Sequence, residues 1–237
     1  MKFDVLTLFP EMFEPIKQSI IGRAIEKNIV EINTIDIRDF SKDKHRHVDD
    51  TVYGGGAGML LRPDVVYDAY KSIKKDNSKV IYMSPQGKKL NQEKVVELAK
   101  EEHLIILCGH YEGIDQRALD LINPEEISIG DYVLTGGEIP AMVLIDSVSR
   151  YIEGVLAEDS TSEESFSNGL LEYPQYTRPV EFKGEIVPEF LQSGHHENIR
   201  KWRLRKSIET TLNKRPDLLE KINLTEEEKK ILEELKK

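Results

Sequence analysis

Short apolar runs alternate with amphipathic segments along the first two thirds of the chain. Runs rich in Val, Ile and Leu predict five β-strands, at 3–9, 30–37, 79–84, 104–108 and 126–129. Apolar residues at helical spacing predict five helices, at 11–27, 63–75, 92–101, 114–122 and 138–151. Near-continuous apolar strands joined by helices are typical of a sheet that is buried on both sides. The pattern therefore predicts an α/β fold, a parallel sheet with helices on both faces.

The character of the chain changes after about residue 153. A stretch that is acidic and rich in Ser and Thr lacks strong periodicity, so we expect a flexible interdomain linker at 158–175. It separates a first domain, 1–157, from a small C-terminal helical domain, 176–237. Helices are expected in that domain at 198–212, 217–221 and 225–237. Thr225, followed three residues later by Glu228, predicts a capping box at the start of the last helix.

Three of the predicted strands end in loops that suit a ligand. These loops are 82–87, 108–113 and 129–138, and each contains glycine, which permits close backbone approach. Any one of them alone fits ordinary turn chemistry. In open parallel sheets, however, ligands bind outside the carboxyl ends of the strands. Three such loops at successive strand ends therefore favour a cofactor cradle.

The charge of the chain is unevenly distributed. With 33 basic and 43 acidic residues the net charge is −10, so the average chain should repel nucleic acid. Eight acidic residues and one basic residue lie in 108–146, and six acidic residues and no basic residue lie in 153–172. The remainder is net basic and contains a cluster at 38–46 and another at 200–206. Each cluster is either a solvated surface or a patch that contacts phosphates.

Several classes of protein are excluded by motif and composition. The single cysteine, Cys108, excludes a disulfide framework or a multi-cysteine zinc site and fits a reducing cytoplasm. No apolar run approaches the roughly 18 residues of a membrane span, and the first ten residues do not resemble a signal peptide. Phosphate-loop, Rossmann, HExxH and GxSxG motifs are absent. His195 and His196 are adjacent, so they point in different directions and do not predict a metal site. We expect a cytoplasmic protein with no membrane partner.

A set of longer motifs is shared with a known family. They include LFPEMF at 8–13, YGGGAGML at 53–60, CGHYEGIDQR at 108–117, SIGDYVLTGGEIPAM at 128–142 and SGHHENIRKWRLRKS at 193–207. Each motif alone is moderately specific, and in this order and spacing they are highly specific. The sequence closely resembles the bacterial tRNA (guanine-N1)-methyltransferases of the TrmD family, in the SPOUT class, over nearly the whole chain.

The resemblance implies a deep trefoil knot in the sheet domain, S-adenosylmethionine bound in a bent conformation, and a homodimer whose sites are built from both chains. The first domain, 1–157, would bind this cofactor, and the C-terminal domain, 176–237, would bind tRNA. Matching the family's motifs gives these cofactor contacts: Tyr82, Pro85, Gly109, Tyr111, Glu112, Ile129, Gly130, Asp131, Tyr132, Val133, Leu134, Gly136 and Gly137. They fall in the three loops already singled out by their position at strand ends.

The family's substrate is guanosine 37 of tRNA, immediately 3′ of the anticodon. N1 of guanine carries a proton that must be removed as N1 attacks the methyl group. The family places a general-base Asp in the linker, and here the matching residue is Glu164, a departure that adds one methylene. Glu163 or a changed mechanism is the alternative. Arg150 matches a family arginine that would contact the target base or the cofactor carboxylate.

The basic clusters supply the expected RNA contacts, Arg46, Arg200, Arg203 and Arg205. The family also implies Mg²⁺, but the sequence spells no magnesium site, and Glu112 and Glu164 are weak candidate ligands. Two other functions stay open. One is a SPOUT enzyme that acts on a different RNA target. The other is a tRNA-binding protein that has lost catalysis, for which the change to Glu164 would be the sign.

Overall fold

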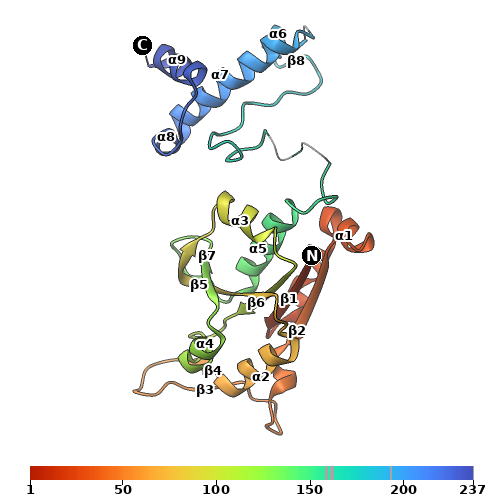
Figure 1. The fold of residues 1–237 in the computed structure, drawn as a ribbon, viewed down its shortest axis with the longest axis vertical. Coiled ribbons are helices and arrows are strands. Elements are labelled where there is room, and N and C mark those ends of the chain that lie inside the picture. Colours follow the sequence, from red (N-terminus) through yellow and green to blue (C-terminus); the bar gives the residue numbers. More distant parts are fainter. Residues whose placement is uncertain (158–159, 161–162, 193, 237) are drawn as a thin grey trace. The chain divides into compact units, whose positions relative to one another are not determined.

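The computed structural model describes residues 1–157, 160, 163–192 and 194–236. The chain divides into two compact units, Met1–Ala157 and Glu158–Lys237 (Figure 1).

The first unit is built on a five-stranded sheet. Its strands are β1 (Lys2–Thr7), β2 (Glu31–Asp36), β5 (Ser78–Lys89), β6 (His103–Cys108) and β7 (Glu125–Ser128). Their order across the sheet is β2-β1-β6-β5-β7, and every neighbouring pair is parallel. The carboxyl ends of β5, β6 and β7 therefore lie at one edge of the sheet. The predicted α/β fold with a parallel sheet is confirmed.

Helices cover both faces of this sheet (Figure 1). One face is covered by α1 (Ser19–Glu26), α3 (Gln92–Leu98) and α5 (Glu138–Ser149), which share a buried apolar cluster. The other face is covered by α2 (Pro63–Ile73) and α4 (Gln116–Ile122), which belong to a second cluster. The sheet is thus the middle of three layers.

The central strand β6 is apolar from Leu104 to Cys108 because both of its faces are buried. Leu104, Ile106 and Cys108 belong to the first cluster, while Ile105 and Leu107 belong to the second. Successive side chains of a strand point to opposite faces, and all five of these are fully buried. A strand between two helical layers has no solvent face, so no polar alternation remains.

The predicted helix at 11–27 is broken in the structure. Two 3₁₀ turns, Pro10–Phe13 and Pro15–Lys17, precede α1, which begins at Ser19. Pro15 lacks the backbone N–H that a continuous α-helix would use, and the chain becomes extended at Gln18 (ψ 176°) before α1 begins. Ser19 adds a positive φ of 57° at the junction.

A short ribbon was missed by the sequence analysis. Strands β3 (Asp49–Thr51) and β4 (Met59–Leu61) pair antiparallel. With three residues each, they are too short for a periodic signal. The glycine-rich loop between them contains four glycines with positive φ, at Gly54, Gly55, Gly56 and Gly58, which explains why glycine recurs there.

The second unit contains helices and one small hairpin. Its elements are β8 (Glu181–Phe182), β9 (Glu185–Ile186), α6 (Glu189–Gln192), α7 (His196–Lys214), α8 (Pro216–Leu219) and α9 (Glu226–Leu235). The predicted capping box at Thr225 is present: its hydroxyl accepts from the Glu228 amide, and the Glu228 carboxylate accepts from the Thr225 amide.

Much of the segment that was expected to be a linker is folded onto α7. The Leu171 amide donates to the hydroxyl of Thr211 at 2.9 Å, and the Ser207 hydroxyl donates to the Leu171 carbonyl. Leu170 is buried beside them. From residue 163 onward the chain therefore belongs to the second unit. Residues 158–159 and 161–162, the remaining acidic part of the stretch, lie outside the described residues.

One ion-pair cluster of the first unit generates a pH prediction. Lys79 and Lys94 each bind the carboxylate of Glu125 at the start of β7, at 2.8 and 2.7 Å. Burial acts to raise the pKa of Glu125, but hydrogen bonds from these two lysines outweigh it, so its pKa lies below the ordinary value of 4.5. A lowered folded-state pKa stabilises the protein above that value, and the contribution disappears as the pH falls through the folded-state pKa.

Glu125→Gln should therefore lower the free energy of unfolding at pH 7 by about 1 kcal/mol. The loss should shrink on acidification below pH 4.5, as measured by urea unfolding at several pH values. Glu93→Gln, an exposed change on α3, removes the same charge and is the control. Equal effects of the two variants would contradict the prediction.

Candidate active site

A loop forms within β5 where the pairing of this strand with β7 is interrupted. Met83 pairs with Ile127, and after the shift Lys88 pairs with the same residue, so residues 84–87 loop out of the sheet. A Cβ on Gly87 would lie 2.5 Å from the backbone nitrogen of Ile127. Glycine is therefore required for the loop to return to β7, and the loop that results forms one wall of a cavity.

The loops after β6 and β7 meet through their backbones. The Gly137 amide donates to the Gly109 carbonyl at 2.8 Å, and His110 forms an isolated antiparallel bridge with Gly136. A Cβ on Gly137 would lie 2.7 Å from the Cα of Cys108. No side chain fits between the two loops at this point, which fixes the second and third walls of the cavity against each other.

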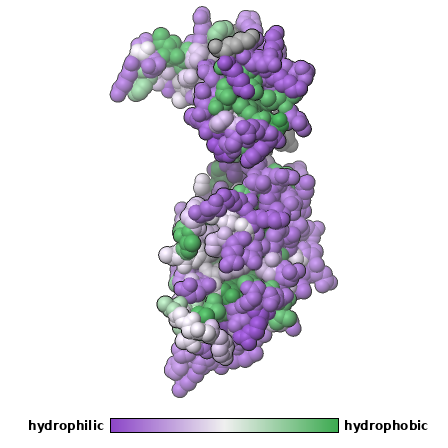
Figure 2. Space-filling view, turned by 90° about the vertical axis from the view of Figure 1, so that its left-hand side faces the viewer, coloured by the Kyte–Doolittle hydropathy of each residue, from purple (hydrophilic) through white to green (hydrophobic). Residues whose placement is uncertain are grey.

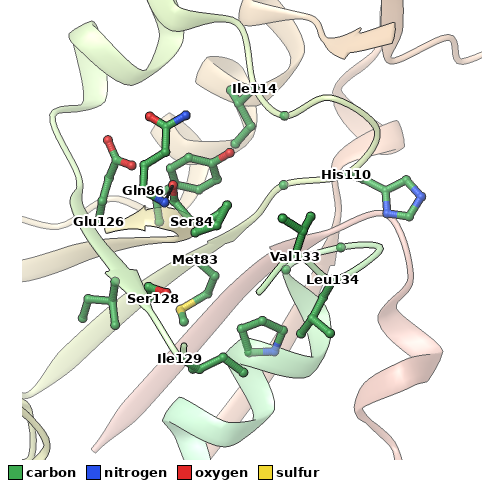
Figure 3. Close-up of a pocket in the computed structure, with 18 of the residues that line it drawn as sticks. Met83, Ser84, Gln86, His110, Ile114, Glu126, Ser128, Ile129, Val133 and Leu134 are labelled. Carbon is green, nitrogen blue, oxygen red and sulfur yellow. Dashed lines mark hydrogen bonds between the residues drawn. The ribbon is translucent and has the colours of Figure 1, made fainter. Parts of the chain in front are cut away.

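The three loops enclose a cavity of about 350 Å³ (Figure 3). Of the thirteen residues predicted to contact the cofactor, twelve line it: Tyr82, Pro85, Gly109, Tyr111, Glu112, Ile129, Gly130, Tyr132, Val133, Leu134, Gly136 and Gly137. The structure thus brings together residues from the interruption within β5, which the sequence predicted as a strand end, and from the loops after β6 and β7. Their contacts to a cofactor stay predictions.

Asp131 is the exception, because it does not line the cavity. Its carboxylate pairs with Lys89 at the end of β5, and its side chain is 79% exposed. In the sequence, the residues directly before and after Asp131 both line the cavity, but the ion pair with Lys89 holds the Asp131 side chain at the surface.

The cavity has a polar side and an apolar side. Figure 3 shows Gln86 and Glu126 together at one side and Val133 and Leu134 at the other. Tyr82 lies in β5 opposite Glu126 in register, and burial together with the Glu126 charge raises the pKa of its phenol. The phenol therefore stays protonated and can donate a hydrogen bond. A ligand with a polar end and an apolar end fits such a lining.

Glu126 and His110 line the cavity but were not among the predicted contacts. The sequence feature that could have identified Glu126 as a cavity residue is a carboxylate inside a predicted strand. His110 lies in one of the three singled-out loops, and its ring stacks edge-on against Phe9 and Tyr111, with centroids 5.0 and 4.8 Å away. Its buried Nδ1 has no hydrogen-bond partner among the described residues. A buried, unpaired polar atom beside a cavity is a natural contact for a polar ligand.

The unpredicted ribbon positions Glu112. The Glu112 amide donates to the Met59 carbonyl of β4 at 3.0 Å. A Cβ on Gly58 would lie 2.6 Å from Oε1 of Glu112, so the glycine leaves room for this carboxylate. The glycine-rich motif at 53–60 therefore has a local reason that the sequence alone did not reveal.

A buried hydrogen bond ties the β7 loop to the first strand. The Thr7 hydroxyl, at the end of β1, donates to the Glu138 carboxylate at 2.8 Å. Both residues are buried, and Glu138 opens α5 directly after the loop.

Burial, with the nearby Glu138 charge, raises the pKa of the Cys108 thiol well above its ordinary value. Cys108 is therefore a neutral packing residue and not a nucleophile.

The two residues predicted to be catalytic lie in different units. Arg150 directly follows α5 in the first unit and is half-buried. Glu164 lies in the second unit, in the segment folded onto α7. Each is described only within its own unit, so their catalytic roles stay predictions.

The arginines predicted to contact RNA are each paired with a carboxylate in this structure. The pairs are Arg46 with Asp39, Arg200 with Glu197 and Glu227, Arg203 with Glu163, and Arg205 with Glu234. All of these side chains remain at least two fifths exposed.

Two searches of the described residues bear on other ligands. No helix among them is long and apolar enough to cross a membrane. In the same part of the chain, no group of three His, Cys, Asp or Glu residues could hold a metal ion. Glu112 and Glu164, the weak candidates for Mg²⁺, belong to different units.

The hydrogen bond between Thr7 and Glu138 can be tested without any ligand. Thr7→Val keeps the shape but leaves a buried carboxylate without its donor, which should lower the free energy of unfolding by about 1–3 kcal/mol. Urea unfolding measures this loss, and Thr51→Val, an exposed change in β3, is the matched control. A Thr7→Val protein as stable as the control would show that the bond contributes nothing.

Comparison with known proteins agrees with the geometry of the cavity. The family model described as tRNA (Guanine-1)-methyltransferase TrmD matches residues 1–221. A relative from Ruminiclostridium cellulolyticum, named tRNA (guanine-N(1)-)-methyltransferase, is 62% identical over 227 residues, covering 94% of this chain and 97% of the relative. Relatives of the same name from Clostridium botulinum strain Langeland and Syntrophomonas wolfei are both 58% identical. The match to the first covers 100% of this chain and 99% of that relative, and the match to the second covers 99% of this chain and 97% of that relative. The chain belongs to the tRNA (guanine-1)-methyltransferase family TrmD.

Proposed function

We propose that this protein transfers a methyl group from S-adenosylmethionine to N1 of guanosine 37 in tRNA. The observation that carries the proposal is the cavity between three glycine-bearing loops in a chain of this family. Its volume of about 350 Å³ falls within the usual range for small-molecule sites.

The residues of the cavity fit this cofactor. Backbone of the three glycine-bearing loops lines the cavity, and carbonyl and amide groups of such loops can read an adenine edge. The phenol of Tyr82 and Nδ1 of His110 are further polar contacts, and Val133 and Leu134 offer apolar surface. We infer that the loops are knotted, as the family resemblance implies.

S-adenosylmethionine supplies an electrophilic methyl group on sulfur. In methyl transfer from this cofactor, the carboxylate of Glu164 would accept the proton that leaves N1 of guanine. Arg150 contacts the target base or the cofactor carboxylate, where a cation offsets negative charge. The target base must leave its stack for N1 to be reached.

The proposed homodimer is supported by exposed apolar side chains near the cavity. Ile139 and Val143 lie one turn apart on α5 and are 46% and 42% exposed, and Val133 in the preceding loop is 82% exposed. Figure 2 shows that the visible surface is mostly hydrophilic, with apolar patches on both units. Apolar groups gathered on a hydrophilic surface are typical of interfaces.

We propose that RNA binds through Arg46 in the first unit and through Arg200, Arg203 and Arg205 of the C-terminal domain, 176–237. The three arginines of α7 lie within six residues of one another. Arginine suits phosphate recognition because its planar guanidinium donates several hydrogen bonds. A tRNA substrate and a single, buried, reduced cysteine are consistent with a cytoplasmic enzyme.

Two tRNA transcripts test the function. Incubation with S-adenosylmethionine should transfer methyl groups to a transcript with guanosine 37 and not to one in which that base is replaced, measured by label incorporation. Equal transfer to both would indicate a different RNA target. Binding of both without transfer would indicate an RNA-binding protein that lacks catalysis.

Variants of Glu164 test the general base. Glu164→Gln should reduce the rate of methyl transfer about 100- to 10,000-fold, because the N1 proton loses its acceptor, with cofactor affinity unchanged. Glu164→Asp keeps the carboxylate and should retain much of the activity. Glu181→Gln, an exposed change in β8, is the control. Full transfer by Glu164→Gln would assign the base elsewhere.

A further inference from the structure

Two arginines of α7 are held by carboxylates of the last helix. Glu227 of α9 accepts from both terminal nitrogens of Arg200, at 3.2 and 3.0 Å, and Glu234 of α9 accepts from Nη1 of Arg205 at 2.9 Å. We call Glu227 and Glu234 the α9 carboxylates. They occupy two of the guanidinium groups that are proposed to bind RNA phosphates.

The contact at Arg200 has the geometry in which arginine binds a phosphate. Nη1 donates to Oε2 of Glu227 and Nη2 donates to Oε1, so two parallel hydrogen bonds join the guanidinium to the carboxylate. Nε and Nη2 donate in the same way to Glu197 of α7, each at 3.0 Å. Both bidentate edges of this guanidinium are therefore taken. A phosphate that binds Arg200 with two hydrogen bonds must displace a carboxylate.

The pairs between α7 and α9 are open to displacement. The side chains of Arg200 and Glu227 are 50% and 43% exposed, and those of Arg205 and Glu234 are 45% and 47% exposed. Water screens such pairs, so each contributes little to stability. An RNA chain offers many phosphates, and their binding to arginine also releases counterions from the RNA. Phosphates can therefore compete with the α9 carboxylates.

The position of α9 does not depend on these ion pairs. The capping box at Thr225 fixes the start of the helix, and its apolar residues Ile231, Leu232 and Leu235 are half-buried where α9 packs on α7. The α9 carboxylates are seven residues apart, about two helical turns, so they lie on one face of α9. Displacing them requires only side-chain rotation, and they stay beside the arginines. The helix lies beyond residue 221, where the match to the family model ends.

We propose that α9 is an internal competitor of RNA. Its carboxylates hold Arg200 and Arg205 in the RNA-free protein, tRNA phosphates displace them in the complex, and this competition weakens tRNA binding. The inference rests on the proposed binding of RNA by α7. It adds a part of the chain that lowers the affinity of that site.

The dissociation constant for a tRNA transcript tests the competition. Glu227→Gln and Glu234→Gln should each tighten binding about 2- to 3-fold, and the double variant about 4- to 10-fold, because the arginines no longer exchange partners. Glu233→Gln is the matched control: it removes the same charge one residue away, and Glu233 is exposed with no ion pair among the described residues. Its effect should stay below about 1.5-fold, since salt screens a charge that makes no contact. Equal tightening by Glu233→Gln would overturn the proposal.

Removal of the arginines separates displacement from general repulsion. The variant Arg200→Gln/Arg205→Gln should bind tRNA more weakly than the wild type. In that background, Glu227→Gln/Glu234→Gln should change affinity no more than Glu233→Gln does. An undiminished effect would mean that the α9 carboxylates repel RNA at a distance, which contradicts displacement. Because all these side chains are exposed, urea unfolding of each variant should resemble that of the wild type.

These measurements are made without S-adenosylmethionine and are independent of methyl transfer. Wild-type affinity of Glu227→Gln/Glu234→Gln would overturn the competition in a protein that still methylates tRNA. Wild-type affinity of Arg200→Gln/Arg205→Gln would overturn both the competition and the proposed RNA contacts of α7. The transcript with guanosine 37 replaced would still decide the proposed reaction.

Discussion

The contact between two backbones, at Gly109 and Gly137, is the constraint on which the candidate site depends. Their hydrogen bond brings the loops after β6 and β7 together with no side chain between them. The buried bond between Thr7 and Glu138 then connects the same loop to β1. Backbone and buried groups therefore hold the loop after β7 at two points. Glycine is required here by geometry, which explains why the loop sequences are rich in it.

The chain carries basic clusters despite a net charge of −10. Acidic and basic residues are unevenly distributed along the chain, and many basic side chains are paired with acidic ones. Acidic residues outnumber basic ones over the whole chain, yet the arginines of α7 form a compact basic cluster. Glu227 and Glu234 of α9 lie against that cluster and neutralise part of it. A phosphate bound to α7, as proposed, would therefore compete with acids of the same unit. The net charge of the whole chain therefore describes neither the basic cluster of α7 nor the carboxylates of α9 that pair with it.

The sequence was most informative where packing is layered. The apolar run of β6 predicted a buried strand because each of its side chains meets a helical layer. Prediction failed where a single residue decided the outcome, as with Pro15, which divides the expected helix at 11–27. It also could not identify polar partners that are distant in sequence. The docking of Leu171 on Thr211 and the pairing of Asp131 with Lys89 leave no periodic signal. In the proposed site, motif and strand position together located the cavity, but not the side chains that turn away from it.

The two proposed halves of the reaction differ in how they are held. The cofactor cavity is fixed by backbone contacts of the sheet, whereas the proposed base lies beside an exposed ion pair of a surface segment. Exposed ion pairs are screened by water and contribute little to stability, so the segment beside Glu163 is held less firmly than the loops around the cavity.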